Sequence, residues 1–549
     1  KHWTYLLLLS SMAFWACSKK SSWAPAYQPL NPVTSLTNQS FLKPGTEDLP
    51  WVRWNFPPEF AEISELEKQL ADMKAAGIAG VEIGQGGEPT RNQIEAVLKK
   101  ANELGIKVSL RYRIGAPVTG TFSIKHDYVR KTLSAADTMI LAGKVFNDSL
   151  PGKGTILSVV AYKISKTPIK GSKLLTIDHA SGVSLTDKIV QKNTSGFFGG
   201  STTGRLQWTA PAGEANWILI TIRVVAVDPQ PEVFSLEGTN LFISGYESYW
   251  TESIKSLFKA NGGGDIFVDS HSIDGFGAPS DVWSSNMAKD FKAKLGYDLM
   301  NYLPALIDEG IDRVSGPRGT GLGINHYYTF SDQSDVRIRA DYNKVRTDLF
   351  VENRIIPFTK WANKYNMALR LQPGDAPTVN IPDQLDVTYN LIRPEHETLS
   401  SGDQIDVYRP MASANHISGN TWYSNELAAA RSLNYAQTFQ DIIVRMNKCF
   451  ASGQTKGVYH VYPYTFNPKS VWPGYNTFGE GNFSNSWGPR NPIWAADAPM
   501  INDWLARNEQ VMKQGVAKID LAVYMQNYSF PAPFSAGIGN VRFWNDLAL

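Results

Sequence analysis

The stretch at residues 51–112, WVRWNFPPEFAEISELEKQLADMKAAGIAGVEIGQGGEPTRNQIEAVLKKANELGIKVSLRY, decides the fold class. It contains three apolar runs that predict buried strands, at residues 51–56, 78–83 and 106–112. Between these runs, apolar residues recur at helical spacing, and capping-box patterns at residues 64–67 and 90–93 mark where two helices begin. Strand, helix, strand, helix, strand with short connections is typical of a parallel α/β sheet.

The same alternation of strands and helices resumes in the second half of the chain. Five further strands are predicted there, at residues 265–269, 368–372, 385–388, 421–426 and 457–462. Helices are predicted at residues 286–295, 341–365 and 435–450. With the first three strands this makes eight, so the sequence predicts an α/β fold, a TIM-like (β/α)8 barrel formed by residues 48–121 and 232–515. The active site of such a barrel lies on loops at the carboxyl ends of the strands.

The region between the two barrel segments has a different pattern. Residues 122–231 contain β-branched runs, as at 156–164 and 217–227, and these are separated by turns rich in Gly, Ser and Thr. This pattern predicts a small antiparallel β domain inserted into the barrel. A last apolar run at residues 519–525 predicts a strand, and we expect residues 516–549 to begin a further domain that this sequence truncates.

The composition of the 549 residues is that of a folded globular protein, with 43% hydrophobic and 19% charged residues. It excludes a wholly disordered chain. The 53 Lys and Arg residues nearly balance the 51 Asp and Glu residues, so the net charge of +2 gives no reason to expect nucleic acid as a partner. Aromatic residues make up 12%, and their flat amphipathic rings suit sugar faces as well as protein cores.

The first 17 residues resemble a bacterial lipoprotein signal peptide. A basic start precedes a short apolar run, and Cys17 follows Ala16 directly. We expect export to the periplasm or cell surface and anchoring to the outer membrane through a lipid on Cys17, with residues 18–47 as a tether. A signal that is ordinarily cleaved or not cleaved is the alternative. Cys449 lies in an apolar helical run and is expected to be a buried structural thiol.

Carboxylates at predicted strand ends are the candidates for chemistry. Glu426 closes one predicted strand, Asp269 ends another, and Glu395 and Glu397 lie in the RPEHE segment. Several carboxylates that converge on a barrel mouth can shift one another's pKa values and supply one acid and one base. An inverting glycosidase needs such a pair about 6.5–9.5 Å apart, with a water between them. The alternative is that they are surface carboxylates paired with neighbours such as Arg393.

Histidines and aromatic residues near the predicted strand ends are candidates for substrate binding. These residues are His271, His416, His460, Trp54, Asn55 and Trp422. A histidine or an amide can hydrogen-bond a hydroxyl group, and an indole ring can stack on a sugar face. The alternative is a structural role, as hydrogen-bonded histidines and, for Trp422, as barrel packing.

Several segments together resemble the α-L-rhamnosidases of glycoside hydrolase family 106. WVRWNFPP before a helix, followed by MKAAGIAGVEI, resembles the opening of that family. Trp283 through LGYDLMNYLPAL, and then DYNKVRTDLFVENRIIPFTKWANKYNMALRLQP, resemble later segments. PEHE, ASANHISG and YSNEL follow in the order of the family. The resemblance runs from about residue 50 to residue 549, is weakest in the β insertion, and depends on this collinear order.

The resemblance implies an inverting exo-hydrolase that removes terminal α-L-rhamnose from polysaccharide or oligosaccharide, with a calcium ion that holds sugar hydroxyls. Carried over by position, Glu426 matches the glutamate of an SAE-like motif and would be the general base. PEHE matches a PEGE-like motif, so Glu395 and Glu397 are both candidates for binding calcium or sugar.

The chain departs from the family pattern where a general acid is expected. The family has Asp-Ser-Tyr-Glu where this chain has Asp269-Ser270-His271-Ser272. Since Ser272 cannot act as the acid, Asp274 or Asp281 in the following loop is expected to supply it. Alternatively, the chain is a related glycosidase on another deoxy or pentose sugar, or a non-catalytic surface lipoprotein that binds sugar.

Overall fold

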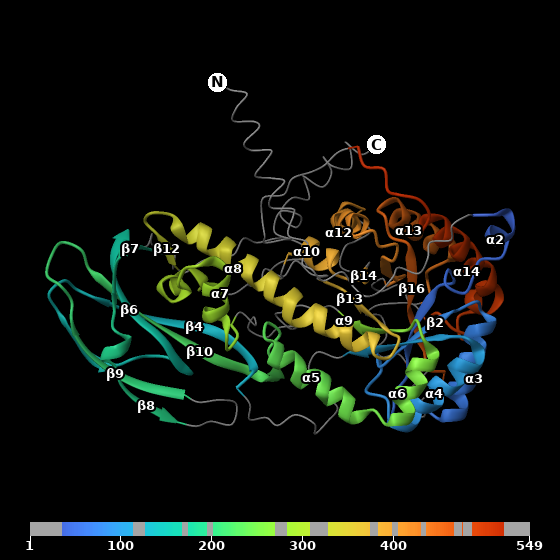
Figure 1. The fold of residues 1–549 in the computed structure, drawn as a ribbon, viewed down its shortest axis with the longest axis horizontal. Coiled ribbons are helices and arrows are strands. Elements are labelled where there is room, and N and C mark those ends of the chain that lie inside the picture. Colours follow the sequence, from blue (N-terminus) through green and yellow to red (C-terminus); the bar gives the residue numbers. More distant parts are fainter. Residues whose placement is uncertain are drawn as a thin grey trace. The chain divides into compact units, whose positions relative to one another are not determined.

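The computed structural model gives the fold of the chain between residues 36 and 520, with internal gaps (Figure 1). It describes residues 36–112, 127–166, 174–194, 201–269, 283–307, 328–373, 383–397, 405–429, 435–465, 475 and 486–520. The predicted signal peptide and most of the predicted tether lie outside these residues. Of the strand predicted at 519–525, only Ile519 and Asp520 are described, and neither is in a strand.

Eight parallel strands close into a barrel, which confirms the predicted fold class. In chain order they are β1 (Trp51–Asn55), β2 (Gly80–Ile83), β3 (Lys107–Tyr112), β11 (Asp265–Val268), β13 (Ala368–Leu371), β14 (Arg393–Glu397), β15 (Ser424–Leu427) and β16 (Lys456–Pro463). Each strand pairs with the next one in this order, and β16 pairs with β1 to close the barrel. The carboxyl ends of all these strands therefore lie at one end, which we call the mouth.

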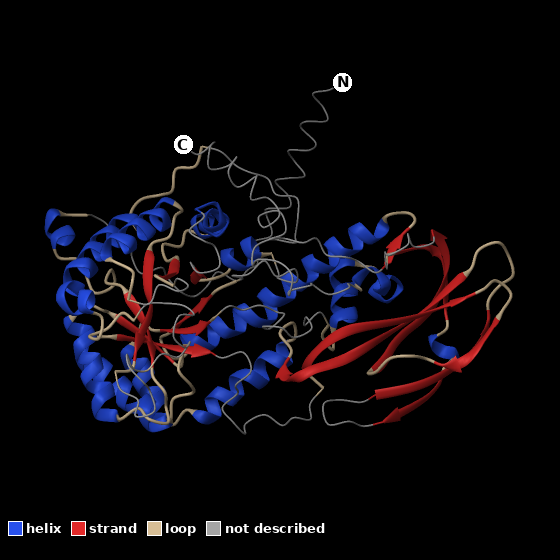
Figure 2. Ribbon diagram, turned by 180° about the vertical axis from the view of Figure 1, so that it is seen from behind, coloured by secondary structure: helices blue, strands red, loops and turns tan. Residues whose placement is uncertain are grey.

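Helices connect the barrel strands and surround them (Figure 2). The α-helices are α2 (Asn38–Leu42), α3 (Ile63–Ala75), α4 (Arg91–Leu104), α5 (Leu236–Tyr249), α6 (Glu252–Asn261), α7 (Met287–Leu295), α8 (Ser334–Phe350), α9 (Ile356–Asn363), α10 (Gln384–Tyr389), α12 (Ile405–Ile417), α13 (Phe439–Ala451) and α14 (Pro492–Met512). Two 3-10 helices, η1 (Thr186–Lys188) and η2 (Leu299–Leu306), are also present. Among the described residues, no helix is both long and apolar enough to cross a membrane.

Local signals set the ends of one helix as predicted and fail at another. In α4, Thr90 and Gln93 form the predicted capping box, and Gly105 ends the helix with a left-handed φ of 69°. The predicted capping box at residues 64–67 is wrong, because α3 begins at Ile63 after Glu62. The backbone N–H of Glu62 donates to the hydroxyl of Tyr464 instead, so a tertiary contact from beyond β16 fixes the start of this helix.

The sixth barrel strand is not where the sequence analysis placed it. Residues 385–388 lie in α10, and Asp383 caps this helix by accepting from two of its backbone N–H groups. The barrel strand is the RPEHE segment itself, residues 393–397. A strand of such polar residues can be buried because its inward side chains form ion pairs inside the barrel, as shown below.

The helix predicted at residues 341–365 is longer and is interrupted. α8 starts at Ser334, a π-helical turn (η3, Val351–Ile355) follows it, and α9 continues to Asn363. The turn ends two residues before Pro357, which has no N–H group to donate to an α-helical hydrogen bond.

The inserted region forms two β-sheets. Its strands are β4 (Val129–Ile140), β5 (Val145–Ser149), β6 (Thr155–Lys166), β7 (Leu175–Ser184), β8 (Val190–Thr194), β9 (Ser201–Thr209) and β10 (Trp217–Pro231). Strands β4, β10, β6 and β7 pair antiparallel in one sheet, and β5, β9 and β8 do so in the other. The sequence analysis did not predict β12 (Tyr328–Phe330), which comes from the barrel segment and adds a parallel strand to β7.

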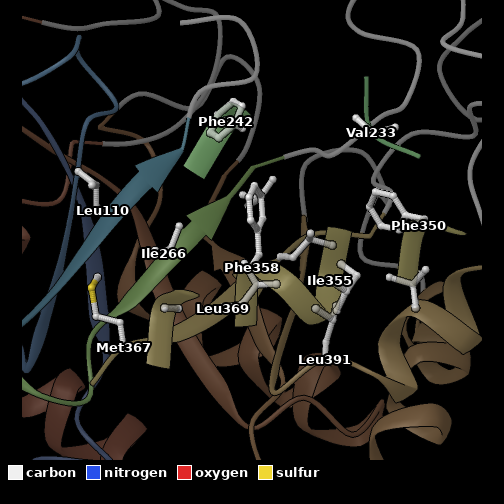
Figure 3. Packing of buried hydrophobic residues seen from close by; sticks show 14 of the residues in the cluster. Leu110, Val233, Phe242, Ile266, Phe350, Ile355, Phe358, Met367, Leu369 and Leu391 are labelled. Carbon is white, nitrogen blue, oxygen red and sulfur yellow. The ribbon is translucent and has the colours of Figure 1, made fainter. Parts of the chain in front are cut away.

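The main hydrophobic core lies between the barrel strands and the helices (Figure 3). Leu110, Ile266 and Leu369 are paired on neighbouring strands β3, β11 and β13 and contribute to this core. Phe358 of α9 and Phe242 of α5 belong to the same cluster, with ring centroids 5.8 Å apart. Because side chains alternate along a strand, the residues beside these three on each strand face the inside of the barrel.

Candidate active site

The mouth receives its side chains from strand positions that alternate with the outer core. On β1, Trp54 faces outward, and its Nε1 donates to Oε1 of Gln69 on α3 at 2.9 Å. Arg53 and Asn55 therefore face inward. The inward residues toward the carboxyl ends of their strands are Asn55 on β1, Arg111 on β3, Asp269 after β11, Glu426 on β15 and His460 in the carboxyl-terminal half of β16.

Arg53 is fully buried and contacts three carboxylates. Its Nε lies 3.2 Å from Oε1 of Glu82, its Nη2 lies 2.5 Å from Oε1 of Glu395, and its Nη1 forms an ion pair with Glu426. The guanidinium group also lies over the ring of Phe267, with 4.5 Å between Cζ and the ring centroid. Burial lowers the pKa of Arg53, but the charges of Glu82 and Glu395 outweigh burial and raise it, so Arg53 stays charged.

A second arginine binds two of the same carboxylates from across the barrel. Nη2 of Arg370 donates to Glu82 at 2.6 Å, and its Nη1 forms an ion pair with Glu395. Its Nε lies 3.1 Å from Oδ2 of Asp265, which also pairs with Arg393 at 3.0 Å. Burial raises the pKa of Glu82, whereas both arginines lower it. Ion pairs thus fill the part of the interior that branched apolar side chains usually fill in such barrels.

Glu426 lies at the top of this ion-pair network and is 5% exposed. Besides its ion pair with Arg53, its Oε1 lies 3.7 Å from Nε2 of His460. Burial, and then the positive charge of Arg53, hold the pKa of His460 well below its ordinary value, so the imidazole is neutral at neutral pH. An ionised carboxylate at this position can accept a proton from a water molecule, and a neutral imidazole can hydrogen-bond a hydroxyl group.

Asp269 and Asn55 complete the described part of the mouth. Asp269 forms an ion pair with Arg111, and the two side chains are 14% and 18% exposed. Asp269 also interacts electrostatically with Arg53 and His460, which places all four groups near one another. Asn55 is fully buried, and its amide has no hydrogen-bond partner among the described residues. The structure therefore brings together three of the predicted residues, namely Glu426, Asp269 and His460, and Asn55 faces the same interior from the end of β1.

Trp422 lies at the opposite end of the barrel, which corrects its assignment as a sugar platform. The strand predicted at residues 421–426 begins only at Ser424, so Trp422 precedes it. Its ring lies 4.3 Å from Cζ of Arg393 and 5.4 Å from the ring of Trp51, and these are the first residues of β14 and β1. Trp422 therefore packs against the amino-terminal end of the barrel.

Two further residues assigned to substrate binding also lie away from the mouth. His416 is in the last turn of α12, and its ring faces Gly453, three residues before β16 begins. It too is at the amino-terminal end, and not near a strand's carboxyl end as predicted. Trp54 is fully buried in the outer core and packs on Phe56 with 5.0 Å between ring centroids. Neither side chain can contact a substrate in the mouth.

The carboxylate of Glu395 does not fit the predicted role of a calcium ligand. It already pairs with Arg53 and Arg370, and it accepts from Gln372 at 3.1 Å and from Ser424 at 2.7 Å. The charge of this carboxylate is balanced by the two arginines, and the side chain is fully buried. Among the described residues, no group of three or more His, Cys, Asp or Glu side chains could hold a metal ion.

The remaining predicted residues fall partly or wholly outside the described residues. His271, Asp274 and Asp281 lie in the undescribed segment 270–282 that follows β11. Glu397 is described only through its backbone, which pairs with Glu426 in the register of β14 and β15.

Arg53, Glu82 and Arg370, which connect Glu426 to the barrel interior, were not among the residues predicted from the sequence. Each is a charged residue in the middle of an otherwise apolar predicted strand. Charged side chains are almost never fully buried unless they are paired. Three such strands in one barrel were therefore the available signal that an internal ion-pair network existed.

Comparisons with known proteins agree with this fold. The family profile for α-L-rhamnosidase, glycoside hydrolase family 106, matches residues 161–534, which is more than half of the chain. A putative beta-glucuronidase of Formosa agariphila is 21% identical over 542 residues, which cover 90% of this chain and 43% of that protein. A rhamnosidase from Novosphingobium sp. PP1Y has a similar fold, with a TM-score of 0.62 and 14% identity over 87% of this chain and 60% of that one. The chain thus spans about half the length of these relatives. The chain belongs to glycoside hydrolase family 106, the α-L-rhamnosidase family.

Proposed function

We propose that the protein is an inverting exo-glycosidase that removes terminal α-L-rhamnose, with Glu426 as its general base. The observation that carries this proposal is the position of Glu426, an arginine-bound carboxylate at the carboxyl end of β15. Catalytic groups of (β/α)8 enzymes come from the carboxyl ends of the strands. Family membership supports the sugar, and the exo action comes from the family resemblance.

In the proposed reaction Glu426 removes a proton from a water molecule. The water oxygen forms a bond to the anomeric carbon while the bond from that carbon to the glycosidic oxygen breaks on the opposite face. A separate acid gives its proton to the departing oxygen. We assign the acid to Asp274, with Asp281 as the alternative, because Ser272 stands where the family has a glutamate. Asn55, Asp269 and His460 would bind sugar hydroxyls from the other strands.

The test is release of rhamnose from p-nitrophenyl α-L-rhamnoside and from a rhamnose-rich pectin. We expect Glu426→Gln to lower kcat about 10²–10⁴-fold, as removal of a general base does. Glu252→Gln is the matched control, because that side chain is 88% exposed on α6. Proton NMR of the first product tests inversion, which releases the β anomer. Near-normal turnover by Glu426→Gln would reject the assignment of the base.

A second candidate, a related glycosidase on another sugar, follows from two observations. The chain has Ser272 in place of the family glutamate, and one relative is named a putative beta-glucuronidase. A panel of aryl glycosides separates the candidates, with a β-D-glucuronide, an α-L-fucoside and an α-L-arabinoside beside the rhamnoside. Cleavage of one of these without cleavage of the rhamnoside would favour the second candidate. Sugar binding in calorimetry without any hydrolysis would instead indicate a non-catalytic sugar-binding protein.

We propose calcium binding with Glu397, and not Glu395, as a ligand, because Glu395 already pairs with two arginines. Chelation followed by calcium titration, with rhamnoside turnover as the readout, tests this. Turnover that chelator does not change would remove calcium from the proposal.

We also propose export and anchoring to the outer membrane through lipidated Cys17. Metabolic labelling with a palmitate analogue tests this, with Cys17→Ser as the control. Equal labelling of both forms, or labelling of neither, would reject the anchor.

A further inference from the structure

The Arg53 guanidinium group is held at its three nitrogens and on one face of its plane. Its three nitrogens face Glu82, Glu395 and Glu426, each carboxylate on a different strand. One face of the guanidinium plane lies on Phe267. The Arg53 and Glu82 side chains are 0% exposed, and that of Glu426 is 6% exposed. An arginine held in this way has one available orientation, since any rotation breaks at least one buried charge-assisted hydrogen bond.

The two carboxylates that hold Arg53 are themselves held from behind. Arg370 binds Glu82 and Glu395, and Ser424 donates to Glu395 at 2.7 Å. Arg370 is fully buried and also pairs with Asp265. The position of Arg53 is thus determined by five barrel strands other than its own: β2, β11, β13, β14 and, through Ser424, the first residue of β15. Glu426 receives its cation from a group that the rest of the barrel has already fixed.

We propose that Arg53 is the positioning residue for Glu426, fixing the direction of its carboxylate and keeping it ionised so that it can take a proton from the attacking water. This inference rests on the proposed function, in which Glu426 is the base. Arg53 does not need to touch substrate, because it acts through the carboxylate. The barrel interior therefore serves as an extension of the active site.

The expected signature is a shift in the pH dependence of the rate. An arginine beside a carboxylate favours its ionised form by about 1–3 pK units. Removing the cation should move the acid limb of the kcat/KM profile to higher pH by roughly that amount. Loss of orientation should also lower kcat about 10²-fold, the size of effect that a misplacement of about 1 Å produces.

The experiment compares Arg53→Met, Arg53→Lys and Arg393→Lys with the wild-type protein. We expect Arg53→Met to shift the acid limb upward and Arg53→Lys to restore part of the shift, because an ammonium group keeps the charge and loses the fork geometry. Arg393→Lys is the control, since Arg393 is equally buried in the barrel but pairs with Asp265. It should change stability and leave the midpoint of the acid limb in place. Circular dichroism confirms that each variant is folded.

Two outcomes would overturn the inference. One is a folded Arg53→Met variant with an acid limb at the wild-type position, and the other is an equal shift in Arg393→Lys. If neither Arg53 variant folds, Glu395→Gln replaces them. Removing a carboxylate that shares Arg53 should move the acid limb to lower pH, and an unchanged limb would again overturn the inference. Glu426→Gln separates the two proposals, because its full activity would refute the base itself.

Discussion

The buried ion pair between Lys456 and Glu509 allows a quantitative test of how the amino-terminal end of the barrel is held together. Lys456 begins β16, and its Nζ lies 2.8 Å from Oε2 of Glu509 on α14, with both side chains fully buried. Nζ also donates to the carbonyl oxygens of Glu47 and Leu49, and Oε1 of Glu509 accepts from the backbone of Gly457 at 2.7 Å. We predict that Lys456→Met destabilises the protein strongly and leaves the chemistry of the mouth unchanged.

The magnitude follows from what the substitution leaves behind. In Lys456→Met the carboxylate of Glu509 stays buried with one backbone N–H donor. Removing one partner of a buried ion pair costs about 3–5 kcal/mol. Burial already raises the pKa of Glu509, so the orphaned carboxyl group can take up a proton, and we expect about 3 kcal/mol. The double variant Lys456→Met/Glu509→Gln should lose less free energy of unfolding than the two single variants lose together, by about 0.5–3 kcal/mol.

The assay is denaturant unfolding followed by far-ultraviolet circular dichroism at pH 7, with kcat/KM on the rhamnoside measured in parallel. Lys68→Met is the control, because Lys68 pairs with Asp72 at 3.8 Å while 64% and 40% exposed. Such a surface pair contributes about 0–1 kcal/mol. The reasoning would be refuted if Lys456→Met lost as little free energy of unfolding as Lys68→Met. It would also be refuted if the losses of the two single variants added up to the loss of the double variant.

Three further predictions follow from the placement of individual residues. Trp422→Leu should lower the free energy of unfolding by about 1–3 kcal/mol, because ring and cation–π contacts are lost, and it should leave KM unchanged. A raised KM would instead indicate that Trp422 contacts substrate. His460→Gln should lower kcat/KM about tenfold, the value of one substrate hydrogen bond, while His416→Gln should not; equal effects would contradict the opposite placement of these histidines. Because the pKa of His460 is held well below 6.5, the unfolded chain binds the extra proton first as the pH falls, so stability is lost below pH 6.5. Unfolding at a series of pH values should show this loss, up to about 1.4 kcal/mol per pH unit, and a shallower loss in His460→Gln; identical slopes would argue against a buried neutral imidazole.

The fold could be predicted where local pattern and tertiary structure agree. Residues 51–112 contain three mainly apolar runs separated by helical periodicity, and all three became barrel strands. The pattern failed at residues 385–388, where four residues cannot distinguish a buried strand from a helical turn. It failed again at RPEHE, because a polar segment predicts a loop unless the charges that will oppose it are known.

The candidate site was predictable where strand ends were predicted correctly. Glu426, Asp269 and His460 meet at the mouth because Glu426 and Asp269 lie at the carboxyl ends of β15 and β11, and His460 lies in the carboxyl-terminal half of β16. Trp422 was misplaced because it was grouped with Glu426, four residues later, whereas that stretch of strand runs from the amino-terminal end of the barrel to its mouth. No local pattern indicates that Arg53 binds Glu395, which is 342 residues away in sequence.

The ion-pair network raises the question of why the barrel keeps charges where apolar side chains would fill the same volume. Replacing buried ion pairs with well-packed apolar residues is often neutral or stabilising, so stability alone does not account for Arg53, Arg370 and their carboxylates. Apolar side chains cannot supply a fixed positive charge directed at the carboxyl end of β15. A guanidinium group held by Glu82 and Glu395 supplies that charge, and its Nη1 forms an ion pair with Glu426 at the mouth. The ion-pair network thus offsets its cost in stability by fixing the position of one reactive side chain, Glu426. The pH profile of Arg53→Met measures whether that position affects the reaction.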